Sequence, residues 1–174
     1  PYSNRGTPTE NKKFTFRAKP EYASYLLDMG ADLTICNQHE SGGELMGDIL
    51  VRSAKLHGTI IAGDLIPRLV DEIPVLAVAA ACADGVTEIH DAQELKVKES
   101  NRLETIAQGL RAFGCDITVL EDGLRIVGGK PLAAHAVCDS FGDHRIAMSM
   151  TIAALAAEGA AEIEGFEAVS VSWP

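Results

Sequence analysis

Three short segments of the sequence place charged side chains before, or at the start of, a run of apolar residues. They lie at 67–74, 96–102 and 142–150. Charged groups in such places are not needed to build a core, whereas carboxylates can transfer protons and arginine or lysine can hold an anion. These three segments are therefore the candidates for chemistry in this chain.

The segment at 96–102 combines cations with a carboxylate. Lys98 and Arg102 are four residues apart, so on a helix they share a face and form a compact site for phosphate or carboxylate. Glu99 stands beside them and is a candidate general acid or base. The alternative is a solvated helix start whose charges only form pairs four residues apart.

The other two segments place charged residues where a helix begins. Asp71 and Glu72 open an otherwise apolar helix, while Asp143, His144 and Arg145 precede a helix of small residues. A helix N-terminus attracts anions, which makes the latter a candidate binding mouth. Each also has a structural alternative, because acids in a first turn favour the helix dipole and Asp143 could be a simple N-cap.

No motif for a metal or an organic cofactor accompanies these residues, and we expect neither. The sequence lacks HExxH, paired histidines at ligand spacing, GxGxxG and the P-loop pattern. Its cysteines are scattered without a CxxC pair, so we expect buried free thiols in a reducing cytosol. They are Cys36, Cys82, Cys115 and Cys138.

The composition is that of a globular protein that does not bind its partners through bulk charge. The 174 residues are 47% hydrophobic and 23% charged, and the net charge is −10. This charge argues against a nucleic-acid partner and against an anionic membrane surface. No stretch approaches the roughly 18 apolar residues of a membrane span, and no signal peptide is visible, so we expect a cytoplasmic location. The chain starts at Pro1, which suggests a fragment.

The spacing of apolar residues predicts alternating helices and strands after residue 20. Helices are expected at 21–29, 67–83, 99–113 and 144–157, with Pro74 dividing the second into a short turn and an alanine-rich core helix. Strands are expected at 32–37, 47–51, 55–61, 87–91, 116–120, 124–127, 135–139 and 161–163. Residues 1–20 have few apolar anchors and are expected to be poorly ordered. These elements indicate an α+β fold with mixed sheets.

A short internal repeat supports this organisation. The sequence MGADLTI at 29–35 matches FGCDITV at 113–119, with the same spacing of apolar residues, Gly and Asp. In both copies a predicted helix ends at the glycine and a predicted strand follows. Repeated helix–strand passages predict stacked copies of one α/β module.

The three charged segments, in their order and spacing, resemble the second half of the EPSP synthases, which belong to the enolpyruvyltransferases. The motifs that carry the resemblance are IPRLVDEIPVLAVAAA, ELKVKESNR and FGDHRIAMSM. The resemblance implies a two-domain fold in which each domain is built from repeated βαβαββ units. It further implies that 21–174 form most of one such domain, truncated at its C-terminal end. Residues 1–20, expected to be poorly ordered, do not contribute to the resemblance.

The resemblance also implies a reaction. The carboxyvinyl group of phosphoenolpyruvate is transferred to the 5-hydroxyl of shikimate 3-phosphate, and phosphate is released, without a metal or organic cofactor. By matched position, Asp71 is the base that contacts the substrate hydroxyls, and Lys98 shares the proton transfer. Glu99 protonates the enol carbon. Because a carboxylate near cations has a lowered pKa, the acid role of Glu99 requires burial or a like charge to offset Arg102.

The anion-binding set is implied in the same way. Arg102 and Arg145 resemble the arginines that clamp phosphoenolpyruvate, and His144 and Asp143 accompany them in the substrate-binding pocket. Glyphosate is a further candidate ligand, and the parent enzyme is expected to be monomeric. Some family members bind substrate through a lysine where Val171 stands here.

Two alternatives stay open. The first is the sister enzyme that transfers enolpyruvyl to UDP-N-acetylglucosamine, which generally lacks the LysGluSerAsnArg and AspHisArg runs. The second is a non-catalytic half-domain that binds ligand weakly. We expect the 174-residue piece alone to be inactive, because a site built between two domains loses its positioning when one is missing.

Overall fold

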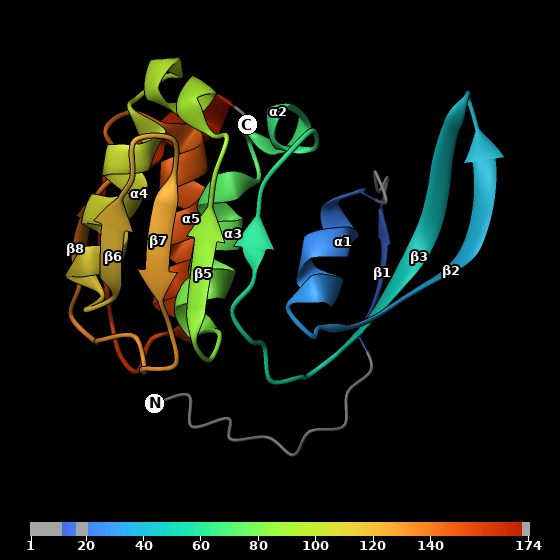
Figure 1. The fold of residues 1–174 in the computed structure, drawn as a ribbon, viewed down its shortest axis with the longest axis horizontal. Coiled ribbons are helices and arrows are strands. Elements are labelled where there is room, and N and C mark those ends of the chain that lie inside the picture. Colours follow the sequence, from blue (N-terminus) through green and yellow to red (C-terminus); the bar gives the residue numbers. More distant parts are fainter. Residues whose placement is uncertain (1–11, 17–20, 172–174) are drawn as a thin grey trace. The chain divides into compact units, whose positions relative to one another are not determined.

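The computed structural model describes residues 12–16 and 21–171, which form two units at 1–55 and 56–174 (Figure 1). Among its described residues, the first unit contains one helix and an antiparallel sheet in the order β1-β3-β2. The hairpin between β2 and β3 turns at Gly42 and Gly43, both of which have positive φ. The elements are β1 (Lys12–Phe16), α1 (Glu21–Asp28), β2 (Asp32–Ser41) and β3 (Glu44–Arg52).

Strand β1 lies inside the segment predicted to be poorly ordered, and this part of the expectation was wrong. The strand pairs antiparallel with β3, from Lys12 opposite Val51 to Phe16 opposite Gly47. The partner lies more than 30 positions along the chain, so a local count of apolar residues could not reveal it. The remaining residues of that segment, 1–11 and 17–20, lie outside the described residues.

The second unit carries all three charged segments. Its main sheet has the order β4-β5-β7-β6, with β4 and β5 parallel and the other pairs antiparallel, and β8 and β9 form a separate parallel pair. The elements are β4 (Ile60–Ile61), α2 (Ile66–Leu69), α3 (Ile73–Cys82), β5 (Val86–Ile89), η1 (Gln93–Val97), α4 (Arg102–Ala112), β6 (Asp116–Val119), β7 (Leu124–Val127), β8 (Val137–Asp139), α5 (His144–Ala156), β9 (Glu162–Glu164) and η2 (Phe166–Val171). This mixture confirms the α+β fold class.

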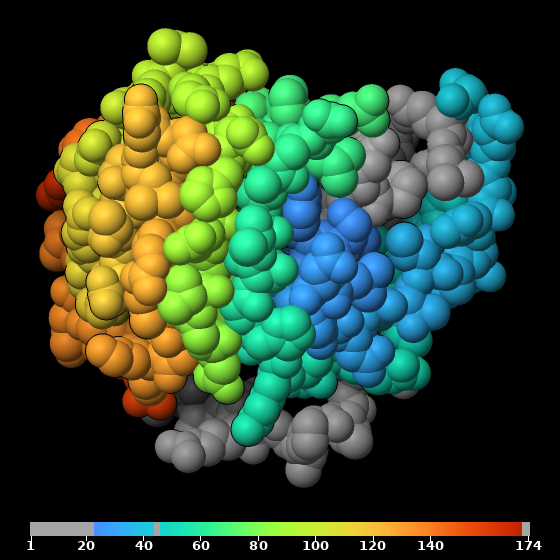
Figure 2. Space-filling model, viewed as in Figure 1, coloured from blue at the N-terminus to red at the C-terminus, as the bar shows by residue number. Residues whose placement is uncertain are grey.

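Helices α3, α4 and α5 pack against one another (Figure 1). Helices α3 and α4 contact strands β7 and β6 of the main sheet respectively, whereas α5 contacts β9 and η2. The other face of this sheet is at the surface (Figure 2), in keeping with the alternating burial along β5, β6 and β7. Helix α3 is apolar on almost every side, and small residues let its neighbours approach. Gly109 of α4 packs so closely on Met150 of α5 that a methyl group there would overlap the thioether.

Several boundaries differ from the predictions. Pro74 does divide the second predicted helix, into α2 and α3. Helix α4 begins at Arg102 rather than at Glu99, because Lys98 has an extended backbone. The strand predicted at 55–61 is reduced to β4, with one isolated bridge at His57. Residues 98–101 therefore form a loop at the site.

Hydrogen bonds at the ends of α1 and α4 confirm the internal repeat. Gly30 has φ 86° and donates to Leu27, while the next amide donates to Leu26. Gly114 has φ 77° and makes the same pair of bonds in α4. This is the Schellman ending, which needs a left-handed residue where glycine alone has no Cβ penalty.

Gly114→Ala should lower the free energy of unfolding by about 1–2 kcal/mol, the cost of left-handed backbone for an L-residue. A Cβ there meets only Ala133 at 3.6 Å, an ordinary contact, so the cost comes from φ and not from a clash. Gly114→Asn is the matched control and should lose less, because asparagine tolerates this conformation. Urea unfolding followed by circular dichroism measures both losses. Equal losses for the two variants would contradict the assignment.

Candidate active site

The N-terminal ends of α3, α4 and α5 meet at one buried guanidinium. Arg102, the first residue of α4, has a fully buried side chain. Its Nη1 donates to Asp71 Oδ1 at 2.8 Å, and its Nη2 donates to Glu99 Oε2 at 2.7 Å. Its Nε donates to Asp143 Oδ2 at 2.8 Å. One cation thus joins residues from all three charged segments.

Asp143 holds this centre from the α5 side. Its side chain is fully buried, and Oδ1 accepts the backbone N–H of Arg145 at 2.9 Å, which caps α5. Its Oδ2 also accepts from the hydroxyl of Ser100 at 3.0 Å. Burial opposes ionisation of Asp143, but the hydrogen bond and charge of Arg102 outweigh it and lower the pKa of this carboxyl. Asp143 is therefore an anion at neutral pH.

Asp71 stands in the loop between α2 and α3 and is about half exposed, at 46%. It bridges both arginines, with Oδ1 on Arg102 and Oδ2 at 3.6 Å from Nη2 of Arg145. Its partial burial raises the pKa, whereas the hydrogen bond to Arg102 and the charges of Arg145 and Lys98 lower it, and the net shift is downward. Asp71 is consequently an ionised carboxylate that can accept a proton.

Glu99 and Lys98 lie at the exposed edge of the cluster. The Glu99 side chain is 49% exposed while it contacts Arg102. Lys98 donates to Glu94 Oε1 at 2.8 Å, and this hydrogen bond raises the pKa of the ammonium. Lys98 is therefore a cation in this arrangement. It can donate a proton or stabilise negative charge, but it must first lose its proton to act as a base.

Arg145 is a cation of the cluster whose N–H groups are not all hydrogen-bonded within the part of the chain that the structure describes. Its side chain is 34% exposed, and its Nε is buried without a hydrogen-bond partner among the described residues. A guanidinium held so loosely can receive an anion. His144 is half-buried beside it, and within residues 12–16 and 21–171 it makes no hydrogen bond to the cluster.

The structure brings the side chains of five predicted site residues together: Asp71, Glu99, Arg102, Asp143 and Arg145. The predicted shared face of Lys98 and Arg102 was wrong, because the backbone at Lys98 is extended and precedes the helix.

Asp143 was expected to bind substrate, but burial leaves it no exposed atom, so we assign it a positioning role.

Two contacts of the cluster were not predicted, although the residues that make them sit inside the motif ELKVKESNR. Ser100 supports Asp143, and Glu94 holds Lys98. Their partners lie respectively 43 and four residues away. A hydroxyl two residues before the buried arginine was the available signal for the first of them.

The described part of the chain contains no group of three or more His, Cys, Asp or Glu placed to hold a metal. The three carboxylates instead surround the guanidinium. Within the same residues, no helix has the length and apolar character needed to cross a bilayer.

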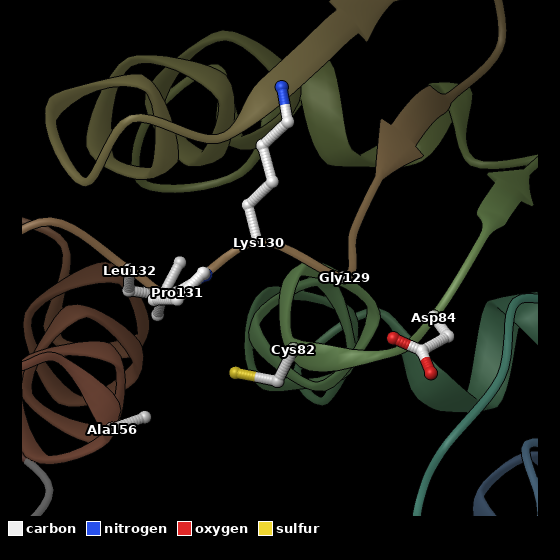
Figure 3. Close-up of a pocket in the computed structure, with 7 residues that line it drawn as sticks. All are labelled: Cys82, Asp84, Gly129, Lys130, Pro131, Leu132 and Ala156. Carbon is white, nitrogen blue, oxygen red and sulfur yellow. The ribbon is translucent and has the colours of Figure 1, made fainter.

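A separate cavity lies at the C-terminal end of α3, away from the charged cluster (Figure 3). Its lining includes Cys82, Asp84 and Lys130, and none of the predicted site residues. Cys82 is exposed rather than buried as expected, and desolvation raises the pKa of its thiol. The amino group of Lys130 points away from the sulfur in Figure 3. Nothing here activates the thiol as a nucleophile.

Comparison with known proteins shows similarity to one enzyme family. The family model of EPSP synthase (3-phosphoshikimate 1-carboxyvinyltransferase) matches residues 14–174. A 3-phosphoshikimate 1-carboxyvinyltransferase of Synechococcus sp. (strain JA-3-3Ab) is 55% identical over 149 residues, which are 86% of this chain and 33% of that protein. The corresponding protein of Desulforamulus reducens is 52% identical over 149 residues, which are 86% and 34%. The chain thus spans about a third of the length of these relatives.

Comparison with solved structures agrees with the family match. An EPSP synthase from Acinetobacter baumannii superposes with a TM-score of 0.87 at 40% identity, covering 95% of this chain and 40% of that one. The enolpyruvyl transferase NikO from Streptomyces tendae has a TM-score of 0.65 at 20% identity, covering 94% and 36% respectively. The latter likeness concerns the fold alone.

Asp143→Asn should lower the free energy of unfolding at pH 7 by about 3–5 kcal/mol, because it leaves the buried Arg102 without its buried counter-charge. The amide keeps the shape of the side chain and can still cap α5. Asp64→Asn makes the same substitution at an exposed position and should change stability by no more than about 0.5 kcal/mol. Chemical denaturation compares them. Similar values for the two variants would rule out the buried pair as a major contributor.

Acidification should remove the stability that the ionised carboxylates of Asp71 and Asp143 contribute. The folded pKa values of Asp71 and Asp143 lie below that of the unfolded chain, so their contribution is present above pH about 4 and is lost as the pH falls through the folded values. Stability curves between pH 7 and pH 3 should therefore fall more steeply for the unsubstituted protein than for Asp143→Asn. Parallel curves would contradict this.

Proposed function

The chain belongs to the EPSP synthase family, and from this premise we propose that it supplies part of the active site of a 3-phosphoshikimate 1-carboxyvinyltransferase. The observation that carries the proposal is the cluster at Arg102, which draws acids and cations from three distant segments to the N-termini of three helices. Such a place suits two anionic substrates, because helix N-termini and arginines both attract oxyanions.

The proposed reaction adds the 5-hydroxyl of shikimate 3-phosphate to C2 of phosphoenolpyruvate while C3 receives a proton. The resulting tetrahedral intermediate then loses inorganic phosphate from C2 and a proton from the C3 methyl group, which regenerates the vinyl group. This chemistry needs a proton acceptor for the hydroxyl, a proton donor for the carbon and cations for the phosphate and carboxylate groups.

The residues present can fill these roles. Asp71 is ionised and half exposed, which suits a base that takes the hydroxyl proton. Lys98 lies close enough for its charge to act on Asp71, so it can stabilise the developing alkoxide. Glu99 is the candidate donor to carbon. Arg145, whose side chain is 34% exposed, is the cation open to phosphoenolpyruvate.

The proposal includes a competing ligand, an oligomeric state and a compartment. Glyphosate would compete for the anion site, and the parent protein would act as a monomer in the cytoplasm. All four cysteines are free, in keeping with a reducing compartment.

Phosphate release by the full-length protein that contains this chain tests the proposal. With phosphoenolpyruvate, release should require shikimate 3-phosphate and should not occur with UDP-N-acetylglucosamine. Asp71→Asn and Glu99→Gln should each lower kcat by about 10²–10⁴-fold, the range for removing an acid or base. Asp64→Asn should retain full activity. The 174-residue chain should give no turnover, because positioning by the rest of the protein is absent.

Two results would contradict this reading. Release with the nucleotide sugar would assign the sister activity, and no release with either acceptor would remove the catalytic role and leave only the family membership.

A further inference from the structure

Every N–H of Arg102 is directed at an acceptor. A guanidinium carries five N–H groups. Here Nε donates to Asp143, and Nη2 donates to Glu99 and, at 3.3 Å, to Asp143 Oδ1. Nη1 donates to Asp71 and faces the carbonyl of Val70 at 3.5 Å. An anionic ligand can therefore bind Arg102 only by taking the place of one of these acceptors, which are three carboxylates and the Val70 carbonyl.

The three carboxylates are not held equally. Asp143 is buried and has two further donors, the hydroxyl of Ser100 and the backbone N–H of Arg145. Asp71 has a second cation, since Arg145 lies 3.6 Å from its other oxygen. Glu99 is half exposed, and among the described residues its one charged partner is Arg102. Glu99 is consequently the carboxylate that leaves at the least cost.

The charges around Glu99 decide what happens to it once displaced. Its Arg102 partner would then be occupied, while the incoming ligand adds negative charge, and a like charge favours the neutral form of a carboxyl group. Lys98 is engaged with Glu94, and Arg145 with Asp71. Around the cluster, Asp71 comes from the α2–α3 loop, Glu94 from η1, Lys98 from the loop between η1 and α4, and Arg102 from α4. Asp143, His144 and Arg145 come from the N-terminal end of α5.

We infer that an anionic group of phosphoenolpyruvate displaces Glu99 from Arg102, and that the freed Glu99 takes up a proton from solvent. The inference rests on the proposed function. It adds a reason why Glu99 becomes protonated only when phosphoenolpyruvate is bound. The proton moves from water to a Glu99 carboxylate oxygen, and no bond of the ligand changes in this step. Binding and formation of the proton donor are thus one coupled event.

Calorimetric titration of the full-length protein with phosphoenolpyruvate tests this coupling. Repeating the titration at pH 7 in buffers of different ionisation enthalpy gives the number of protons taken up per ligand bound. The phosphate of the ligand itself titrates near pH 6, so the informative quantity is the difference between variants. Glu99→Gln should remove most of the uptake, on the order of one proton per ligand. Glu104→Gln, an exposed glutamate in the first turn of α4, should leave the uptake unchanged.

The same variants give a second readout in affinity. The unsubstituted protein should bind phosphoenolpyruvate up to about tenfold more weakly for each pH unit above neutrality, because a proton must be taken up with the ligand. Glu99→Gln should lose this dependence, apart from the part due to the ligand, and should bind more tightly than the unsubstituted protein at pH 8. A purely structural role for Glu99 would not change the slope.

Three outcomes overturn the inference. They are equal proton uptake with and without Glu99, loss of uptake in Asp71→Asn but not in Glu99→Gln, and an absence of phosphoenolpyruvate binding to the folded protein. If phosphate release with shikimate 3-phosphate persists in any of these cases, the proposed function stands and only the coupling fails. If release is absent but uptake at Glu99 is found, the proposed function fails and the coupling of anion binding to protonation stands.

Discussion

The second unit of this chain is organised around the cost of burying one positive charge. Taking an arginine out of water costs several kcal/mol unless it is paired and hydrogen-bonded. Arg102 meets this requirement only because Asp71, Glu99 and Asp143 converge on it from three elements. The N-terminal ends of α3, α4 and α5 are thereby tied to a single point, and moving any one of them would leave a buried charge without its partner.

The close packing of the helices makes this convergence feasible. Alanines along α3, and Gly109 against Met150, let the helices approach closely enough for short side chains to meet at their ends. The hydrogen bonds that fix Asp143 then set the direction of the guanidinium. The close apolar packing of the helices requires that the polar groups of the cluster be fully hydrogen-bonded, because a buried hydrogen-bond network that is only partly satisfied is costly.

Exposure separates the supporting groups from the reacting ones. Arg102 and Asp143 are buried, whereas Asp71, Glu99 and Arg145 each present part of the side chain to solvent. The exposed groups are those suited to proton transfer and anion binding, and the buried pair holds them at fixed separation. The arrangement is also compatible with the proposed anionic substrates in a chain of net charge −10, since the arginines and the helix N-termini act locally.

Elements whose signals are local could be predicted from the sequence. The hairpin of β6 and β7, the division of the helix at Pro74 and the repeated endings at Gly30 and Gly114 all depend on residues a few positions apart. The sequence also marked the three charged segments, through their motifs. Which side chains meet could not be predicted in this way, because Asp71 and Asp143 lie respectively 31 and 41 residues from Arg102. The same holds for the strand β1, whose partner β3 is distant in the chain, and for the burial that makes Asp143 a support and not a contact. Periodicity and capping are read within one or two turns, whereas pairing across the fold depends on how separate elements pack.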